Sequence, residues 1–331
     1  MTELYSEGEA HSPDVPDVAV ARTSRAVSSA ALRPIVARYL AGELSAQVAL
    51  MQMVIACEDA GAVRRAVDEV TAEADAHSRA TDAIIRDRVD ALTRLVVENE
   101  TGCGRIAQML RSDIDHARPA RSVEEGLAHV ERLFDWSVGQ SEEASVALYS
   151  LGSPEILAQA TAEIVARLDA WGLLGPDRRV LQIGCGIGRF ERALAPRVRE
   201  AHGIDVSAGM VRVAQRRCAG LANVVLAKSS GRDLGMYPDE RFDLVYAVDT
   251  FPYLVQSGRA LVERHFAEAH RVLRAGGELA IFNYSYGDDP AEDRRAVRAL
   301  ADAHGFSVVL DGERPFELWD GAAWRLRKEP A

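Results

Sequence analysis

The sequence predicts an all-α region followed by an α/β domain with a mostly parallel seven-stranded sheet whose last strand is antiparallel. Apolar residues repeat at helical spacing from about residue 24 to residue 110, and short apolar runs alternate with helical segments after residue 139. Strands that alternate with helices imply right-handed crossovers and parallel pairing, whereas the last two runs have no helix between them and should pair antiparallel. We divide the 331 residues into a disordered tail (1–20), a helical N-terminal domain (21–138) and the α/β domain (139–331).

Composition narrows the classes of protein. Hydrophobic residues make up 48% and charged residues 27%, without the run of about 20 apolar residues that a membrane helix requires. The net charge of -11 disfavours a nucleic-acid partner. The acidic first twenty residues do not resemble a secretory signal. The four cysteines form no CxxC pair and have no nearby histidine at metal-ligand spacing, so we expect a cytoplasmic protein without disulfides or a metal site.

Two sets of apolar residues in the N-terminal region have spacings of three and four, which places each set on one helix face. They are Leu44, Val48, Met51 and Ile55, and Ile85, Val89, Leu92 and Val96. The stretch from Asp113 to Arg121 interrupts the period and is the predicted connector. A new helix should begin at Ser122, because Ser122 and Glu125 have the spacing of a capping box.

The α/β domain begins with a helix that Ser153 caps and Pro154 opens. Seven strands follow. We place them at Val180 to Ile183, His202 to Ile204, Val224 to Ala227, Leu244 to Val248, Leu279 to Phe282, Phe306 to Leu310 and Ala323 to Leu326.

The first strand runs into three glycines at alternate positions, Gly184, Gly186 and Gly188, and then into a helix. Such a loop lets the backbone approach a nucleotide closely. A dinucleotide fingerprint would need a further glycine at position 189, which is arginine, so a nicotinamide oxidoreductase is disfavoured. Asp205 ends the second strand 21 residues after Gly184 and can accept hydrogen bonds from both hydroxyls of a ribose. The alternative is a loop acid that caps the next helix.

From about residue 142 onward the chain resembles the class I S-adenosylmethionine-dependent methyltransferases. The resemblance rests on the loop from Gln182 to Gly188, on Asp205, on the strand start Phe242-Asp243-Leu244-Val245-Tyr246, on the Gly276-Gly277 turn and on the closing antiparallel pair. It implies a Rossmann-like sheet, S-adenosyl-L-methionine as the cofactor and transfer of its methyl group by direct displacement.

The resemblance also implies which residues contact the cofactor. They are Gln182, Gly184, Cys185, Gly186, Gly188, Asp205, Val206, Met210, Ser230, Gly231, Asp249 and Tyr149. The family usually has an acid where this chain has Gln182, which keeps hydrogen bonding and loses the charge. Glu142 or Glu143, in a lid segment before the core, are candidates to restore that charge, with helix-face solvation as the alternative. Asp233 is the alternative to Ser230 at the adenine.

In this architecture the acceptor lies at the C-terminal ends of the fourth and fifth strands. We expect Asp249 to orient or deprotonate it, with Tyr253 and Tyr284 as the other catalytic candidates, although Asp249 can also be read as a helix cap. Phe251, Tyr253, Tyr284 and Tyr286 are candidates for an aromatic wall beside the sulfonium, and at least two of them should simply pack. His265 and His270 are read as surface or packing residues, and Trp319 as edge packing, with acceptor contact as the alternative for Trp319.

Three classes of function stay open. A methyltransferase with a small-molecule acceptor leads, followed by one that acts on protein or RNA and by a cofactor-binding partner protein without catalysis. The N-terminal helices are a lid over the acceptor, a dimer face or a docking surface. We expect no nucleic acid and no membrane as partners, and a homodimer through these helices is possible.

Overall fold

The fold is described here from a computed structural model, which describes residues 17–77, 83–112, 120–287 and 289–329. The chain forms two compact units, Met1–Gly104 and Arg105–Ala331, which we treat separately. This division differs from the predicted boundary at 138/139. The reason is that helix α7 (Val123–Gln140) packs against α10 (Ala208–Arg217) and α11 (Phe251–Ser257) and therefore belongs to the second unit.

The first unit is helical, as predicted. Its helices are α1 (Asp17–Arg25), α2 (Arg33–Ala41), α3 (Ala46–Cys57), α4 (Ala60–Ala76) and α5 (Ala83–Glu98), and α6 (Glu100–Leu110) crosses into the second unit. Residues 17–20, assigned to the tail, form the start of α1, and residues 1–16 lie outside the described part.

The second predicted apolar face is buried on α5, whereas only Leu44 and Val48 of the first set are buried. Ile85, Val89, Leu92 and Val96 are all buried on α5. On α3, Ile55 is 41% exposed, whereas Leu50 and Met53 are fully buried. Helix α3 is apolar around most of its circumference, so the spacing of a few residues does not identify the side that faces the core.

Helix α7 begins where the capping-box spacing predicted. The Ser122 hydroxyl accepts a hydrogen bond from the Glu125 N–H at 3.2 Å, and the Glu125 carboxylate accepts one from the Arg121 N–H at 3.0 Å. Two N–H groups at the helix entrance are thereby satisfied. Residues 113–119 of the predicted connector lie outside the described residues.

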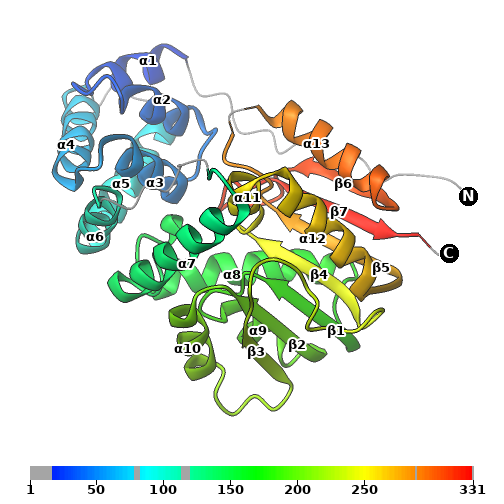
Figure 1. The fold of residues 1–331 in the computed structure, drawn as a ribbon. Coiled ribbons are helices and arrows are strands. Elements are labelled where there is room, and N and C mark those ends of the chain that lie inside the picture. The colour runs from blue at the N-terminus through cyan, green and yellow to red at the C-terminus, as the bar shows by residue number, and fades with distance from the viewer. Residues whose placement is uncertain (1–16, 78–82, 113–119, 288, 330–331) are drawn as a thin grey trace, which may run out of the picture. The chain divides into compact units, whose positions relative to one another are not determined.

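The second unit is built on a seven-stranded sheet (Figure 1). Its strands are β1 (Gly175–Ile183), β2 (Val198–Asp205), β3 (Val224–Lys228), β4 (Phe242–Val248), β5 (Leu273–Phe282), β6 (Phe306–Glu313) and β7 (Ala323–Lys328). They lie in the order β3-β2-β1-β4-β5-β7-β6, and β7 is antiparallel to both of its neighbours. The predicted α/β class, the seven strands and the antiparallel last strand are therefore confirmed.

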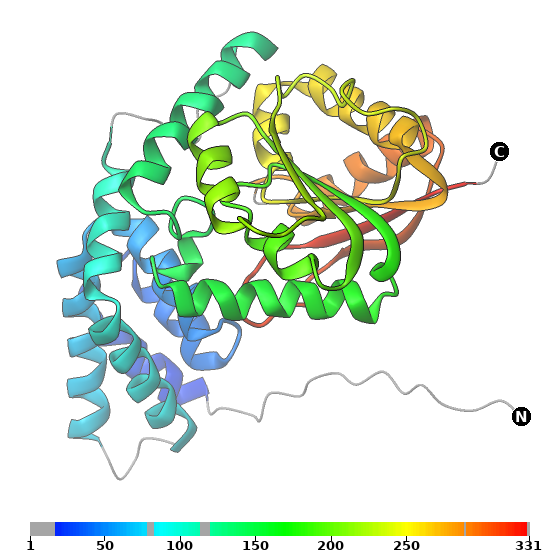
Figure 2. The ribbon, with the colours of Figure 1, turned by 90° about the horizontal axis from the view of Figure 1, so that it is seen from below.

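Helices cover both faces of this sheet (Figures 1 and 2). On one face lie α8 (Pro154–Ala170) and α9 (Arg189–Leu194), and on the other lie α12 (Arg259–Val272) and α13 (Pro290–Ala303). The core under α12 and α13 includes fully buried Phe251 and Phe266. None of the helices in the described ranges combines the length and the apolar character needed to cross a bilayer.

The parallel strands set the position of the site. Because β1, β2, β4 and β5 run in the same direction, their carboxyl ends meet at one edge of the sheet. Asp205 is the last residue of β2, and Gly184, Asp249 and Asn283 directly follow β1, β4 and β5. The motif residues that the sequence singled out thus lie next to one another.

Phe266→Ala tests the core on the α12 side. The fully buried ring packs edge-on against Phe251 and Phe306, so its loss should lower the free energy of unfolding by about 3 to 5 kcal/mol. All four tryptophans (136, 171, 319 and 324) lie in the second unit, so their fluorescence during urea unfolding monitors that unit alone. The control Val309→Ala, at an exposed position of β6, should cost about 0.5 kcal/mol or less. Equal losses in both variants would contradict the assigned core.

Candidate functional site

The glycine loop between β1 and α9 has the conformation that its sequence requires. Gly184, Gly186 and Gly188 have φ angles of 72°, 53° and 74°, in the left-handed region that side chains disfavour. The space is also occupied, because a Cβ on Gly186 would lie 2.6 Å from Cγ1 of Val146. The loop is anchored to the next strand, since the N–H groups of Gly184 and Cys185 both donate to the Ile204 carbonyl, at 2.8 and 2.9 Å.

Asp205 joins the loop to the end of β2. Its carboxylate accepts hydrogen bonds from the Gly186 N–H and from the Ser207 N–H, each at 2.9 Å. The side chain is only 8% exposed, and burial raises the pKa of its carboxyl to about 6, against the backbone hydrogen bonds that lower it. The nearby Asp135 carboxylate raises this pKa further. No cation of the described residues is among the groups that shift this pKa, and a buried acid in such surroundings is suited to hydroxyl donors.

Gln182 lies beneath the loop and is 2% exposed. Its amide nitrogen donates to the Gly184 carbonyl at 3.3 Å, and its amide oxygen accepts from the Tyr246 hydroxyl at 3.3 Å. Both groups of the amide are therefore engaged in holding the loop on the sheet. An ionised acid at this position would have no N–H with which to bond the Gly184 carbonyl.

Behind the loop, Glu191 is fully buried, and neither carboxylate oxygen has a hydrogen-bond partner in the described part of the chain. Burial raises the pKa of this carboxyl to about 8, so the group is protonated at neutral pH. It lies against Gly203, where a Cβ would be 2.7 Å from Oε1. Glu191 therefore adds no negative charge beside Asp205 at pH 7.

The predicted adenine residues come together at the ends of β2 and β3. Gly231, with a φ of 71°, lies so close to Val206 and to Leu127 of α7 that a Cβ would be 2.6 and 2.7 Å from their methyl groups. The Ser230 hydroxyl accepts from the Arg232 N–H at 3.2 Å. Asp233 accepts from the Gly235 N–H at 3.1 Å, so its carboxylate stabilises a local turn. Met210 is buried on α10.

Helix α7 supplies a residue that sequence reasoning missed. The Asp135 carboxylate accepts from the Ser207 hydroxyl at 2.6 Å and from the Gly209 N–H at 2.7 Å. It thereby satisfies the Gly209 N–H and the Ser207 hydroxyl at the start of α10, just after Asp205. The contact joins residues more than 70 positions apart and has no local sequence signal.

Asp249 and Asn283 end neighbouring strands, and both have left-handed backbone conformations, with φ angles of 54° and 72°. The Asn283 amide donates to the Asp249 carboxylate at 2.9 Å, and the Asp249 N–H donates to the Phe282 carbonyl at 2.9 Å. Burial raises the pKa of the Asp249 carboxyl to about 6, while the Asn283 hydrogen bond and the Arg189 charge lower it. Strained residues of this kind are typical of active sites. Sequence reasoning had given Asn283 no role.

Two of the four rings proposed for an aromatic wall, Phe251 and Tyr284, pack in the core. From the sequence we expected this of at least two of them. Phe251 is fully buried, and Tyr284 is buried between Phe251 and Trp324. The catalytic role of Tyr284 stays a prediction. Tyr253 and Tyr286 remain near Asp249: their hydroxyls share a hydrogen bond, and their ring centroids are 5.8 Å apart. Burial raises the pKa of Tyr253 to about 12, so its hydroxyl stays protonated.

Tyr149 and Arg189 form a pair at the entrance of α9. The Arg189 guanidinium donates to the Tyr149 hydroxyl at 3.0 Å and to the Thr161 hydroxyl at 3.2 Å. Its charge lowers the pKa of both Tyr149 and Asp249, so the guanidinium acts on both groups. Arg189 directly follows the third glycine, and from the sequence we inferred only that it disfavours a nicotinamide cofactor.

The acids of the lid segment have partners away from the loop. Glu142 forms ion pairs with Arg216 and Arg217 of α10, and Glu143 pairs with Arg217 at 2.6 Å. These ion pairs attach the lid segment to α10, so the two glutamates do not restore the negative charge absent at Gln182. The alternative, a helix face exposed only to solvent, does not account for the ion pairs either.

The residues read as packing residues do pack. His265 is buried, with Nδ1 2.9 Å from the Leu261 carbonyl, and the His270 ring lies against Phe306. Trp319 is buried against Phe316 and Tyr149.

Comparison with known proteins identifies the domain. A family model described as "Methyltransferase domain" matches residues 181–281. The chain carries a class I S-adenosylmethionine-dependent methyltransferase domain. This confirms the family predicted from the glycine loop and Asp205.

The curated relatives are similar over part of their length. Phosphoethanolamine N-methyltransferase 1 of Arabidopsis thaliana is 32% identical over 128 residues, which are 38% of this chain and 24% of that protein. Demethylmenaquinone methyltransferase of Tropheryma whipplei (strain Twist) is 30% identical over 107 residues, 32% of this chain and 42% of that protein. The chain thus spans about a quarter of the plant methyltransferase and less than half of the bacterial one.

A solved structure shares the fold. The phosphoethanolamine N-methyltransferase 1 of Haemonchus contortus, in complex with phosphoethanolamine and S-adenosylhomocysteine, superposes with a TM-score of 0.52 at 18% identity, covering 63% of this chain and 50% of that one.

The contact between Asn283 and Asp249 can be tested by titration. The amide stabilises the ionised carboxylate, so Asn283→Ala should raise the pKa of Asp249 above about 6. Asn283→Gly removes the same amide without straining the left-handed backbone and should give the same shift. Carboxyl ¹³C NMR with labelled aspartate measures the pKa, and Asp249→Asn identifies the resonance. Ser285→Ala, whose hydroxyl bonds Asp293, should leave it unchanged. A lower pKa in either Asn283 variant would contradict the assignment.

Proposed function

We propose that this protein is an S-adenosylmethionine-dependent methyltransferase that acts on a small-molecule acceptor. The observation that carries the proposal is the arrangement of Asp205, the glycine loop and Asp249 along one edge of a parallel sheet in a methyltransferase domain. The matched segment covers about a third of the chain, so the activity of the whole protein is an inference from this site.

The residues present fit the cofactor. A carboxylate offers about four accepting positions, and backbone N–H groups of Gly186, Val206 and Ser207 take at most three of those of Asp205, which leaves capacity for ribose hydroxyl donors. Val206, Gly231 and Leu127 present methyl and backbone surface suited to adenine. Arg189, which bonds the Tyr149 hydroxyl, is the cation suited to the carboxylate of the methionine end.

When bound, the cofactor supplies a methyl group on a sulfonium centre, which a nucleophile displaces directly. The protein therefore has to align the acceptor, exclude water and manage a proton. Alignment near 3 to 3.5 Å can supply roughly 7 to 11 kcal/mol of barrier reduction. Asp249 is suited to accept a hydrogen bond or a proton from the acceptor, because its carboxyl, with a pKa of about 6, is mostly ionised at pH 7.

Two features favour a small acceptor. The plant and nematode relatives are named for phosphoethanolamine and the bacterial one for demethylmenaquinone, none of which is a macromolecule. The approach to Asp249 is also narrowed by Tyr253, which packs edge-on against Phe134 of α7 with ring centroids 5.1 Å apart. A homodimer through the N-terminal helices stays a prediction.

Asp205→Ala should weaken S-adenosylmethionine binding by about tenfold or more, because charge-assisted hydrogen bonds to the ribose are lost. Isothermal titration calorimetry measures the affinity, and Asp302→Ala on the exposed side of α13 is the control of equal charge change. An affinity equal to that of the unmodified protein would refute the ribose assignment.

The same carboxylate makes binding depend on pH. Without the cofactor, the pKa of the Asp205 carboxyl is about 6, and the ribose hydroxyl donors should lower it. Cofactor binding below pH 6 should therefore release a proton. Affinity should therefore be constant above about pH 7 and fall as the pH decreases through 6. Asp205→Asn should remove most of this dependence, whereas Asp249→Asn should retain it.

Asp249→Asn should slow methyl transfer by about 100-fold or more, the usual size of a general-base contribution, with little change in cofactor affinity. In the unmodified protein the rate should rise with pH through about 6, as the carboxyl loses its proton. Single-turnover assays with the acceptor measure the rate. An unaltered rate would remove Asp249 from the mechanism, and cofactor binding without turnover on any tested acceptor would favour the non-catalytic class.

A further inference from the structure

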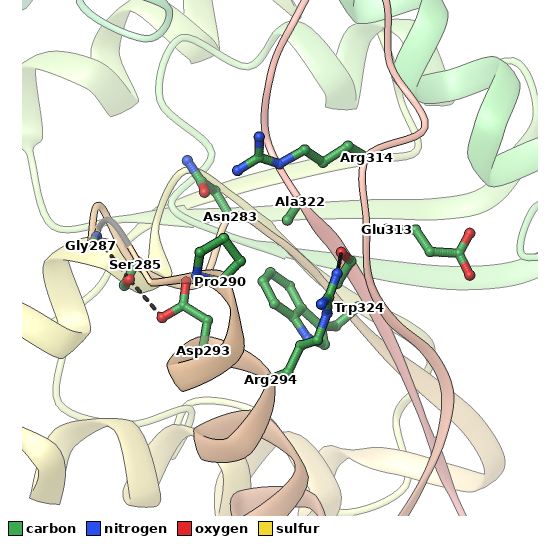
Figure 3. Close-up of a pocket in the computed structure, with 11 residues that line it drawn as sticks. Asn283, Ser285, Gly287, Pro290, Asp293, Arg294, Glu313, Arg314, Ala322 and Trp324 are labelled. Carbon is green, nitrogen blue, oxygen red and sulfur yellow. Dashed lines mark hydrogen bonds between the residues drawn. The ribbon is translucent and has the colours of Figure 1, made fainter. Parts of the chain in front are cut away.

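A cavity of about 550 Å³ adjoins the proposed methyl-transfer site (Figure 3). It lies where β5 ends, between the start of α13 and the chain that joins β6 to β7. Asn283 lines this cavity and also donates its amide to Asp249. Asn283 therefore connects the cavity to the proposed base, Asp249.

Arg314 gives the cavity a cation that the protein itself does not neutralise. Figure 3 shows its guanidinium extending toward Asn283. Within the described ranges, Arg314 forms no hydrogen bond or ion pair. The neighbouring Arg294, by contrast, donates to the carbonyls of Asp311 and Gly312, at 3.1 and 3.2 Å. An arginine left unpaired at a cavity is suited to bind a carboxylate or phosphate in a bidentate manner.

The cavity wall carries a second unused donor. The Trp324 side chain lines the cavity and is buried, and its indole Nε1 has no hydrogen-bond partner among the residues that the structure describes. Buried indole N–H groups usually have a partner, so this donor is unused within the described part of the chain.

The acidic residues of the cavity do not neutralise Arg314. Glu313 directs its carboxylate away from the other labelled side chains in Figure 3. Asp293 accepts the Ser285 hydroxyl at 2.7 Å on the α13 side, and burial together with nearby Glu292 and Asp289 raises the pKa of its carboxyl. The Asp293 end of the cavity thus accepts hydrogen bonds, while the Arg314 end donates them.

We propose that this cavity binds the methyl acceptor, and that the acceptor is a small molecule with a carboxylate or phosphate group held by Arg314. This rests on the proposed function and adds the chemical class of its substrate. With the anion at Arg314, the rest of the acceptor extends past Asn283 toward Asp249, and a donor group on it can reach Asp293.

Trp324 provides the readout. The chain has four tryptophans, so ¹⁵N-tryptophan labelling of the full protein should give four indole N–H resonances, and Trp324→Phe identifies the one from the cavity. Titration with inorganic phosphate, and separately with acetate, should shift that resonance, whereas uncharged ethylene glycol should not. If phosphate binds at the lower concentration, the acceptor carries a phosphate group. If acetate does, the acceptor carries a carboxylate.

Arg314→Gln should raise the midpoint of this titration by about tenfold or more, and Arg314→Lys, which keeps the charge without the planar fork, by less. Arg199→Gln is the matched control, because Arg199 is exposed and unpaired among the described residues and lies at the start of β2. No shift with either anion, or equal midpoints in Arg314→Gln and the unmodified protein, would overturn the proposal. The anion titration needs no cofactor, so calorimetry with S-adenosylmethionine is an independent test. Cofactor binding without anion binding would overturn only the cavity proposal, whereas absence of cofactor binding would contradict the proposed function.

Discussion

The site depends on one buried carboxylate that holds two segments of backbone. Asp205 ends β2 and accepts N–H groups from Gly186 on one side and Ser207 on the other, so a single side chain sets the position of the glycine loop relative to the start of α10. Burying this carboxylate is costly, as its pKa of about 6 indicates. The cost is tolerated because the backbone dipoles stabilise the charge and because hydroxyl donors can complete its hydrogen bonding.

The second constraint is strain at the ends of β4 and β5. Asp249 and Asn283 are not glycines, yet both adopt left-handed backbone conformations and bond to each other through their side chains. Each such residue costs of order 1 to 3 kcal/mol, which the flanking strands supply through backbone hydrogen bonds, such as that from the Asn283 N–H to the Ala322 carbonyl at 2.7 Å. This arrangement fixes the carboxylate beside the cavity that Asn283 lines.

Local patterns were sufficient to predict the strands and to choose candidate site residues at their ends, but they did not predict contacts between distant segments. Gly184 to Gly188, Asp205 and Asp249 follow strands, and parallel strands bring their ends together, so position along the chain predicts position in space. Tyr284 and Tyr286 show where this fails. They alternate along an irregular segment after β5, and only packing decides that Tyr284 enters the core while Tyr286 is 51% exposed. Arg314 likewise carries no pattern that indicates a cavity.

The contacts of helix α7 explain why the methyltransferase unit begins before residue 139. If the unit began at residue 139, the Ser207 hydroxyl and the Gly209 N–H would lose the Asp135 carboxylate, and Gly231 would lose its contact with Leu127. Those groups surround Asp205, and Asp135 also raises the pKa of that carboxyl. Helix α7 therefore affects the charge of the proposed ribose site through Asp135. Because residues at both of its ends contact this region, α7 belongs to the site as much as the glycine loop does.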